Sequence, residues 1–413
     1  MKRVLVISNG CFSLTDSNGR TLSKLFSGYD PSCLAQVYTY GTPDFGVCKN
    51  YYKITDKAVL KSLVTRKSGG YPVEDDGQPQ NSALSAIRKK TKRTPFRKLV
   101  RELIWKYSGW YKGRFMKWLQ EFSPEAVLVF AGDGGFIMDC ARIVAEHFNI
   151  PVVIYTTEDY CFKDYNYLTK RKSLFYSLFY SNLKKSYNKL APHVAKGFFN
   201  TPMLTECYAS EFSFPCECLF ARSDIEFASS DAEVDRENIR VSYLGNLGLN
   251  RHLPLMDIAD ALGRVAPNTV LDVYGAADEE VKSAFDANPN VSYKGFVNYD
   301  EVVDIIHSSD LVVHAEYDEP FNLRDLKAAF STKIPDSVSS GTPLLMYANE
   351  SLACTDFLIR NKCAFVATDK DMLDDVIKDA LFNAEKRAEV IATAEGVCKE
   401  YFISNDPMVN YFN

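Results

Sequence analysis

The sequence predicts an α/β protein with two doubly wound parallel-sheet domains that face each other across a cleft. From Arg240 onward, short apolar runs alternate with helical patterns, which indicates a parallel sheet covered by helices on both faces. The chain also begins with a buried-strand pattern at 2–8, a Gly-containing loop and a helix start, as a doubly wound unit does. Its 413 residues suffice for two such cores.

The domain junction is expected near 215–237. Helical and strand periodicity weaken around 200–222, and the stretch 229–238 is acidic and polar. We therefore predict an N-terminal domain over 1–220 and a C-terminal domain over 221–394, with a C-terminal helix of about 395–413 that packs back on the first domain.

Composition narrows the class of protein. The chain is 46% hydrophobic and 24% charged, which is typical of a soluble globular protein. Its net charge of −5 argues against general nucleic-acid binding. Only four strongly apolar residues, Val4–Ile7, follow the basic start, too few for a signal peptide. The 11 scattered cysteines indicate reduced thiols and a cytoplasmic location.

The first candidate site is the loop after the first strand, which we expect to end with the residues from Ser17 to Leu22 at a helix start. Gly19 would let the backbone approach a ligand, and Arg20 could meet a phosphate or an acceptor. A simple strand–helix turn explains the same pattern.

A basic run at 88–93 precedes a predicted helix with one apolar stripe. The stripe consists of Phe96, Leu99, Val100, Leu103, Ile104 and Tyr107. With three nearby tryptophans, the region 88–118 would suit contact with an anionic membrane surface. The alternative is a helix packed on the sheet with a solvated basic face.

Two further strands, at 126–130 and 151–155, end in loops that are expected to face the cleft. The first loop, 131–135, is rich in glycine and could be only a tight turn. The second carries Glu158 and Asp159, and two adjacent carboxylates are costly to bury without a role.

In the second half, strands are predicted at 241–244, 270–274, 291–293, 311–314, 343–347 and 364–367. The loop after the first of them contains Gly245 and Gly248, which permit close approach by a diphosphate. Arg251 opens the following helix and could bind the same group, although a surface salt bridge is the alternative.

The stretch 331–347, STKIPDSVSSGTPLLMY, organises the second domain. Ser331 and Thr332 are N-cap residue types, and the short helix is expected to end near Gly341. A helix start with hydroxyls and Lys333 is an anion site, and Asp336 could accept both ribose hydroxyls. An ordinary capped helix before a strand is the alternative.

A D-x-D string at 369–371 precedes a helical pattern, so Asp369 is interpreted as an N-cap. We expect no metal ion and no other cofactor.

The 331–347 string closely resembles the nucleotide-binding helix of glycosyltransferases with the GT-B fold. Within this group, the chain looks most like the retaining family 4 enzymes of bacterial polysaccharide synthesis. On that resemblance Asp336 holds the donor ribose, while Ser331, Thr332 and Lys333 lie near the diphosphate. The donor base would be held by four residues at two strand ends: Tyr274, Gly275, Phe296 and Val297.

The sequence also departs from the family pattern at several positions. Asn246 stands where the family has an arginine, whereas Arg251 falls on the position of its lysine. Glu158 replaces a common histidine, and Asp159 matches the aspartate after it.

The usual Glu-x7-Glu spacing would place the first glutamate at Ala328. Glu316, which follows a His-x dipeptide, is therefore assigned as the carboxylate that touches the donor sugar, with Asn322 beside it.

The resemblance implies transfer of a sugar, with retention, from a UDP- or GDP-sugar to a saccharide or lipid-linked saccharide acceptor. The expected setting is polysaccharide, capsule or exopolysaccharide biosynthesis in the cytoplasm or at the inner face of the membrane. Two alternatives stay open: a nucleotide-sugar 2-epimerase of the same fold, and a non-catalytic nucleotide-sugar-binding subunit.

Overall fold

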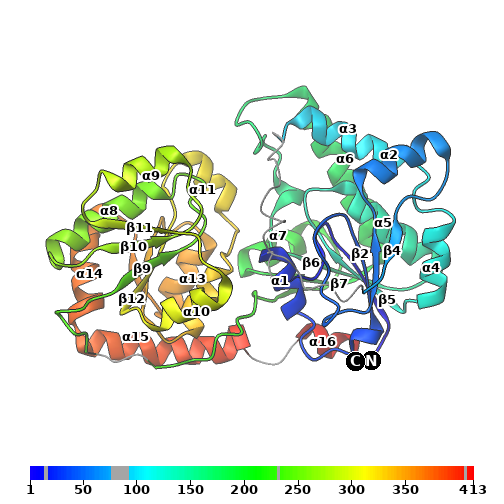
Figure 1. Ribbon diagram of the computed structural model, residues 1–413. Coiled ribbons are helices and arrows are strands. Elements are labelled where there is room, and N and C mark those ends of the chain that lie inside the picture. The colour runs from blue at the N-terminus through cyan, green and yellow to red at the C-terminus, as the bar shows by residue number, and fades with distance from the viewer. Residues whose placement is uncertain (14–16, 76–92, 230–232, 404–406) are drawn as a thin grey trace. The chain divides into compact units, whose positions relative to one another are not determined.

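A computed structural model describes residues 1–13, 17–75, 93–229, 233–403 and 407–413 (Figure 1). The chain divides into two compact units. The first contains Met1–Leu219 and the last residues of the chain, and the second is Phe220–Ser404. Each unit is built around its own sheet.

The first unit contains an eight-stranded sheet that is parallel except where β4 joins its edge. In spatial order the strands are β4 (Tyr71–Val73), β3 (Asn50–Lys53), β2 (Leu34–Tyr38), β1 (Val4–Ile7), β5 (Ala126–Phe130), β6 (Val152–Thr156), β7 (Val194–Phe199) and β8 (Cys216–Cys218). The strand order reverses between β1 and β5, so the loops after these strands are where a ligand of this unit is expected.

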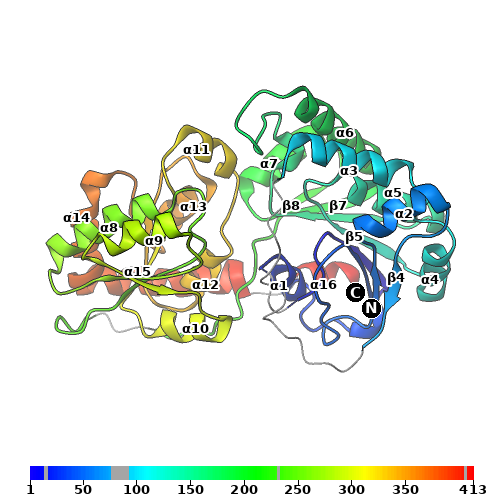
Figure 2. The same ribbon diagram turned by 45° about the horizontal axis from the view of Figure 1, so that its top comes forward.

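Helices cover both faces of this sheet. They are α1 (Ser17–Lys24), α2 (Asp56–Thr65), α3 (Pro95–Tyr107), α4 (Arg114–Phe122), α5 (Gly135–Phe148), α6 (Leu174–Leu190), α7 (Pro202–Glu211) and α16 (Pro407–Phe412). Figure 2 shows α2, α3, α5 and α6 together on one side of the sheet and α1 with α16 on the other. Val4 and Val6 pack with Leu22 of α1 and with Met408 and Phe412 of α16 in one buried core.

The second unit contains a six-stranded, entirely parallel sheet. Its order is β11 (Val291–Gly295), β10 (Leu271–Tyr274), β9 (Val241–Leu244), β12 (Leu311–Ala315), β13 (Leu344–Tyr347) and β14 (Phe365–Ala367). Its helices are α8 (His252–Val265), α9 (Glu279–Asp286), α10 (Tyr299–His307), α11 (Pro320–Leu326), α12 (Lys333–Ser339), α13 (Ala353–Asn361), α14 (Leu373–Phe382) and α15 (Ala384–Val397).

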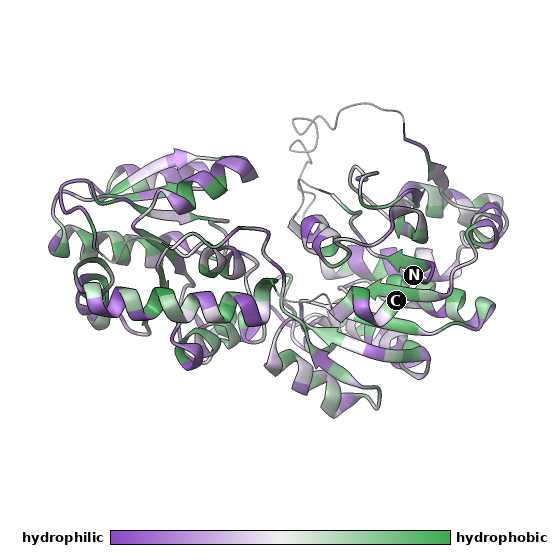
Figure 3. Cartoon of the chain, turned by 90° about the horizontal axis from the view of Figure 1, so that it is seen from below, coloured by the Kyte–Doolittle hydropathy of each residue, from purple (hydrophilic) through white to green (hydrophobic). Residues whose placement is uncertain are grey.

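All six strands predicted for the second half are present within two residues of their expected bounds. Apolar runs bounded by turn residues read clearly here because strands of a parallel sheet are covered on both faces. In each unit such strands form the interior, where Figure 3 shows hydrophobic residues. The predicted class, two doubly wound parallel-sheet domains, is confirmed.

The segment that returns to the first unit is shorter than the predicted 395–413. Helix α15 and the short π-helix that follows it, Cys398–Ile403, belong to the second unit, and only α16 packs in the first. The amide of Lys2 donates to the carbonyl of Phe412 over 3.2 Å, which fixes this end of the chain beside β1.

The apolar stripe predicted for α3 is not the buried face of the helix, so the alternative in which this stripe packs on the sheet is wrong. The buried residues of α3 are Pro95, Lys98, Glu102 and Trp105, whereas Phe96 is 54% exposed and Tyr107 is 70% exposed. The reason is that the two polar side chains find partners on the β5–α5 loop, so the helix turns its charged face inward. Of the region 88–118, residues 88–92 lie outside the described part.

Candidate functional site

The charged centre of the second unit lies where the strand order reverses, at the carboxyl ends of β9 and β12. Arg251 directly precedes α8, and Glu316 is the first residue after β12. The guanidinium binds the carboxylate with two hydrogen bonds, Nε to Oε2 and Nη2 to Oε1, each 2.8 Å long. Glu316 is only 6% exposed, so this is a buried, bidentate pair and not the surface salt bridge weighed as an alternative.

His314 completes this centre. Its Nε2 lies 3.3 Å from Oε1 of Glu316, and burial lowers the pKa of the imidazole. Burial alone would raise the pKa of Glu316, but His314 and Arg251 outweigh it and the net shift is downward. The centre therefore combines a neutral imidazole, a carboxylate and a guanidinium.

Gly245 brings Lys333 to the same place. A Cβ on Gly245 would lie 2.7 Å from Oη of Tyr243 and 3.1 Å from Cε of Lys333, so the α12 lysine packs directly on the β9 loop. The carbonyl of Asn246 accepts from Tyr243 Oη over 2.9 Å and from Arg251 Nη1 over 3.3 Å. Two predicted cations, Arg251 and Lys333, thus meet at one loop.

The β9–α8 loop has an unusual backbone. Leu249 and Asn250 have φ angles of 60° and 59°, in the left-handed region that side chains disfavour. Asn322 in α11 is buried, and its Nδ2 donates to the carbonyl of Leu249 over 2.9 Å. The sequence placed Asn322 at the donor; in the structure it fixes the loop that carries Arg251.

Asp336 lies in the first turn of α12 and is half-buried. Its Oδ1 accepts a hydrogen bond of 2.8 Å from Ser223 Oγ. At the helix start, Ser331 Oγ accepts from the amide of Lys333 over 3.4 Å, while Thr332 is the N-cap without a side-chain bond. The helix ends before Gly341, whose φ of 80° is that of a glycine C-terminus, as predicted.

The four residues assigned to the donor base lie at the neighbouring strand ends. Tyr274 ends β10, and the amide of Gly245 donates to its carbonyl over 2.9 Å. A Cβ on Gly275 would lie 2.0 Å from the carbonyl oxygen of Gly245, so only glycine fits. Phe296, next to Val297 beyond β11, is 79% exposed.

In the first unit, Glu158 and Asp159 share a buried cation. Lys163 is 3% exposed, and its Nζ lies 3.1 Å from Asp159 Oδ1 and 3.9 Å from Glu158 Oε2. The four-residue spacing from Asp159 to Lys163 was the available signal for this partner, and it was missed.

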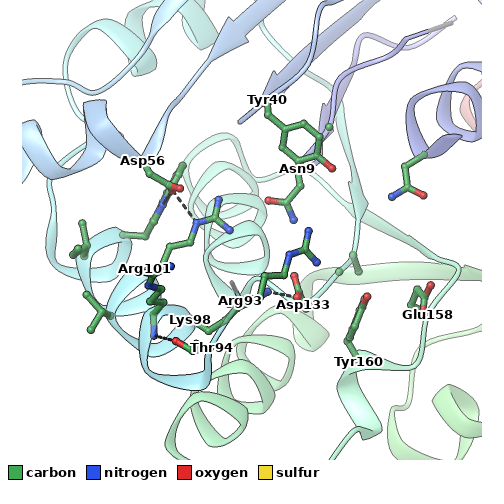
Figure 4. Close-up of a pocket in the computed structure, with 18 of the residues that line it drawn as sticks. Asn9, Tyr40, Asp56, Arg93, Thr94, Lys98, Arg101, Asp133, Glu158 and Tyr160 are labelled. Atoms are coloured by element: carbon green, nitrogen blue, oxygen red, sulfur yellow. Dashed lines mark hydrogen bonds and ion pairs between the residues drawn. The ribbon is translucent and has the colours of Figure 1, made fainter. Parts of the chain in front are cut away.

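A cavity of about 1120 Å³ lies within the first unit, lined by the start of α3 and the loops after β1, β5 and β6 (Figure 4). On its wall, Lys98 Nζ binds Asp133 Oδ2, which also accepts from Tyr167 Oη over 2.8 Å. Glu158 lines the same cavity. Lys98 and Asp133 were not assigned any role from the sequence.

The side chain of Glu102, one turn along α3 from Lys98 of the cavity wall, caps the start of α5. Its two carboxylate oxygens accept from the amides of Gly135 and Phe136, each over 3.1 Å. Burial raises the pKa of Glu102 to about 7. The Gly-rich loop 131–135 thus leads into a helix start that a side chain of the protein already fills.

The prediction that Gly19 lies in a loop is wrong. It is buried in α1, where a Cβ would lie 2.7 Å from the carbonyl oxygen of Cys11 and 2.7 Å from Cβ of Ser13. Gly19 therefore permits close packing of α1 on the β1 loop, and Arg20 follows it as a half-buried helix residue.

Within the described ranges, no group of three or more His, Cys, Asp or Glu side chains is arranged to hold a metal ion. The interpretation of Asp369 as a cap is confirmed, because its carboxylate accepts from the amide of Asp371 over 2.8 Å. No helix in the part of the chain that the structure describes is long and apolar enough to cross a membrane.

No family model and no curated protein matches the sequence. Solved structures are similar over nearly the whole chain. Anabaena HepE in complex with UDP-glucose has 12% sequence identity and a TM-score of 0.59, and the match covers 99% of this chain and 97% of that one. The chain has the GT-B fold.

Two further solved structures with the GT-B fold match over a similar share of the chain. WaaG, a glycosyltransferase involved in lipopolysaccharide biosynthesis, has 12% identity and a TM-score of 0.55, with 96% of this chain and 95% of that chain covered. Sucrose-phosphate synthase from Thermosynechococcus elongatus has 9% identity and a TM-score of 0.60, with 97% and 94% covered. At these identities the likeness concerns architecture alone.

Proposed function

We propose that the chain transfers a sugar, with retention, from a UDP- or GDP-sugar to a saccharide or lipid-linked saccharide acceptor in polysaccharide, capsule or exopolysaccharide biosynthesis. The observation that carries the proposal is the meeting of Arg251, Lys333 and Glu316 at the switch point of the second sheet. The GT-B architecture, found also in a UDP-glucose complex, supports it.

In this proposal the second unit binds the donor. Arg251 and Lys333 carry the charge of the diphosphate, and Glu316 orients the guanidinium through its two hydrogen bonds. Asp336 accepts from the ribose hydroxyls, and Phe296 offers its exposed ring to the base.

The reaction would form a bond between an acceptor hydroxyl oxygen and the donor's anomeric carbon, while the bond from that carbon to the diphosphate breaks. The proton of the acceptor hydroxyl passes to the departing diphosphate. Arg251 and Lys333 stabilise the negative charge that develops on the leaving group.

The first test concerns Asp336. Asp336→Ala is expected to weaken UDP or GDP binding about tenfold or more, because a charge-assisted hydrogen bond to ribose is lost. Isothermal titration with the nucleotide and its 2′-deoxy form measures this, since only the intact carboxylate should discriminate between them.

Ser223→Ala is the matched control. It removes the internal hydrogen bond of Asp336 and leaves the carboxylate in place. If Ser223→Ala and Asp336→Ala bind nucleotide equally well, the ribose assignment is wrong.

Because side chains carry the leaving-group charge in this proposal, chelation of divalent ions with EDTA is expected to leave turnover unchanged. Turnover is followed as nucleotide diphosphate release. Loss of turnover with EDTA and recovery with Mg²⁺ or Mn²⁺ would show that a metal ion shares this charge.

A non-catalytic binding subunit is the second candidate. The observation in its favour is that the carboxylates of Glu316 and Asp336 already bind partners within the protein, Arg251 and Ser223. Nucleotide binding without donor turnover, in the presence of a range of acceptors, would support it. Donor turnover that needs no acceptor would favour the 2-epimerase instead.

We also propose peripheral contact with an anionic membrane through exposed apolar side chains on α3 and α6. Leu103 and Tyr107 of α3, and Leu174 and Leu178 of α6, are 38% to 73% exposed, and Phe96 contacts Phe175 with ring centroids 5.2 Å apart. Exposed Arg97, Lys106, Arg171 and Lys172 lie along the same helices and the segment before α6.

Leu174→Ser combined with Leu178→Ser is expected to reduce sedimentation with vesicles that contain an anionic lipid. The control is Leu253→Ser on α8, a comparably sized exposed residue of the second unit. Equal sedimentation of all three proteins would contradict the membrane proposal.

A further inference from the structure

We propose that the cavity of the first unit binds an acidic saccharide, one that bears a phosphate or a carboxylate, as the acceptor of the transfer. That this saccharide is an acceptor rests on the proposed function, whereas the binding site rests on the residues that line the cavity.

The charge of the lining is the first argument. Among the residues that the structure describes, five cationic residues line the cavity against three carboxylates, although the whole chain has a net charge of −5. The cations are Lys57, Arg93, Arg97, Lys98 and Arg101, and the carboxylates are Asp56, Asp133 and Glu158. A cavity with excess positive charge in an acidic protein favours an anionic ligand.

Each of the three carboxylates is beside a cation of the protein. Arg101 Nε lies 2.8 Å from Asp56 Oδ1, which also accepts from Trp105 Nε1 over 2.8 Å. Asp133 is paired with Lys98, and Lys163 lies behind Glu158. Asp56 and Asp133 are thus neutralised by lining cations, whereas Glu158 shares Lys163 with Asp159. Lys57, Arg93 and Arg97, all exposed, outnumber Glu158 and give the cavity its excess positive charge.

Most of this charge comes from α3 and the residue before its cap, Arg93, while Lys57 belongs to α2. In Figure 4 the labelled Arg93 and Lys98 lie near Asp133, and Asn9, Tyr40 and Tyr160 line the same cavity. Arginine forks match carboxylate and phosphate oxygens, and the amide and aromatic side chains suit the hydroxyls and apolar faces of sugars.

The nearby helix start is not the anion site. Glu102 holds the first amides of α5, so an incoming anion would meet a buried carboxyl there. Recognition therefore falls to the arginines at the cavity. The volume of about 1120 Å³ exceeds what one monosaccharide fills, which leaves room for more than one sugar unit.

The test uses the full chain and three probes at constant ionic strength: glucose, glucuronic acid and glucose 6-phosphate. Ligand-detected NMR and isothermal titration measure binding of each. We expect one or both acidic sugars to bind about tenfold or more tightly than glucose. Comparison of the two acidic probes shows whether the anion is a carboxylate or a phosphate.

The variant Arg93→Gln/Arg97→Gln should lose this preference. The control Lys61→Gln/Lys67→Gln removes two exposed cations of the same unit that do not line the cavity, and it should keep the preference. Equal binding of acidic and neutral sugars, or equal behaviour of the two double variants, overturns the proposal.

UDP is titrated in parallel, so that failure of the donor site can be told apart from failure of the cavity. Absence of UDP and GDP binding with an intact preference for acidic sugars would refute the proposed donor site only. If UDP binds to the wild type but not to Arg93→Gln/Arg97→Gln, the cavity binds the nucleotide and the acceptor proposal is overturned.

Discussion

Replacement of Arg251 by methionine is expected to lower the free energy of unfolding by about 3–5 kcal/mol. The change leaves the carboxylate of Glu316 buried without the cation that binds it through two hydrogen bonds of 2.8 Å. In the double variant Arg251→Met/Glu316→Gln the stranded charge is gone, so most of the lost stability should return. Urea unfolding of the wild type, the single variants Arg251→Met and Glu316→Gln, and the double variant gives the coupling energy.

Arg264→Met is the matched control for this cycle. Arg264 also binds a carboxylate, Asp374, but the two side chains are 55% and 46% exposed. An exposed pair is expected to contribute less than about 1 kcal/mol. If Arg251→Met and Arg264→Met lower the free energy of unfolding by similar amounts, the buried Arg251–Glu316 pair contributes no more than an exposed pair and the prediction is wrong.

The pH dependence of stability is expected to depend on Glu102. Its pKa is raised from an ordinary 4.5 to about 7 in the folded protein, chiefly by burial. The folded state therefore holds a proton that the unfolded state releases between these values. Protonated Glu102 therefore makes its full contribution to the free energy of unfolding below about pH 4.5. This contribution, about 3 kcal/mol in total, is lost as the pH rises through about 7.

Glu102→Gln removes the titrating group and keeps an oxygen that accepts from one amide of α5. Its free energy of unfolding should therefore change less than that of the wild type between pH 5 and pH 8, measured by urea unfolding at each pH. The exposed Glu121 on α4 supplies the control Glu121→Gln, which should retain the wild-type slope. A wild-type stability that rises over this range would contradict the assignment.

The parts of the fold that the sequence predicts well are those that depend on neighbours along the chain. Strands such as β9 and β12 are continuous apolar runs, and the end of α12 at Gly341 follows from a local glycine signal. The buried face of α3 could not be predicted this way, since Lys98 and Glu102 find their partners more than thirty residues away.

In the candidate site, too, single residues could be identified from the sequence but contacts between distant residues could not. Arg251 was identified from its place at a helix start after a strand, and Glu316 from the family resemblance, but their pairing joins positions 65 residues apart. The sequence assigned one to the phosphate and the other to the sugar. Only the three-dimensional arrangement shows that the carboxylate holds the guanidinium, and that Asn322 holds the loop on which it stands.

The two left-handed residues of that loop, Leu249 and Asn250, bear on how quickly an anion can be bound. Their strained backbone persists because Asn322 anchors it, and Arg251 directly after them is gripped by Glu316. The guanidinium is thus preorganised, so in the proposed function a diphosphate would bind without a rotamer search by the arginine. Little side-chain entropy remains to be lost at that moment.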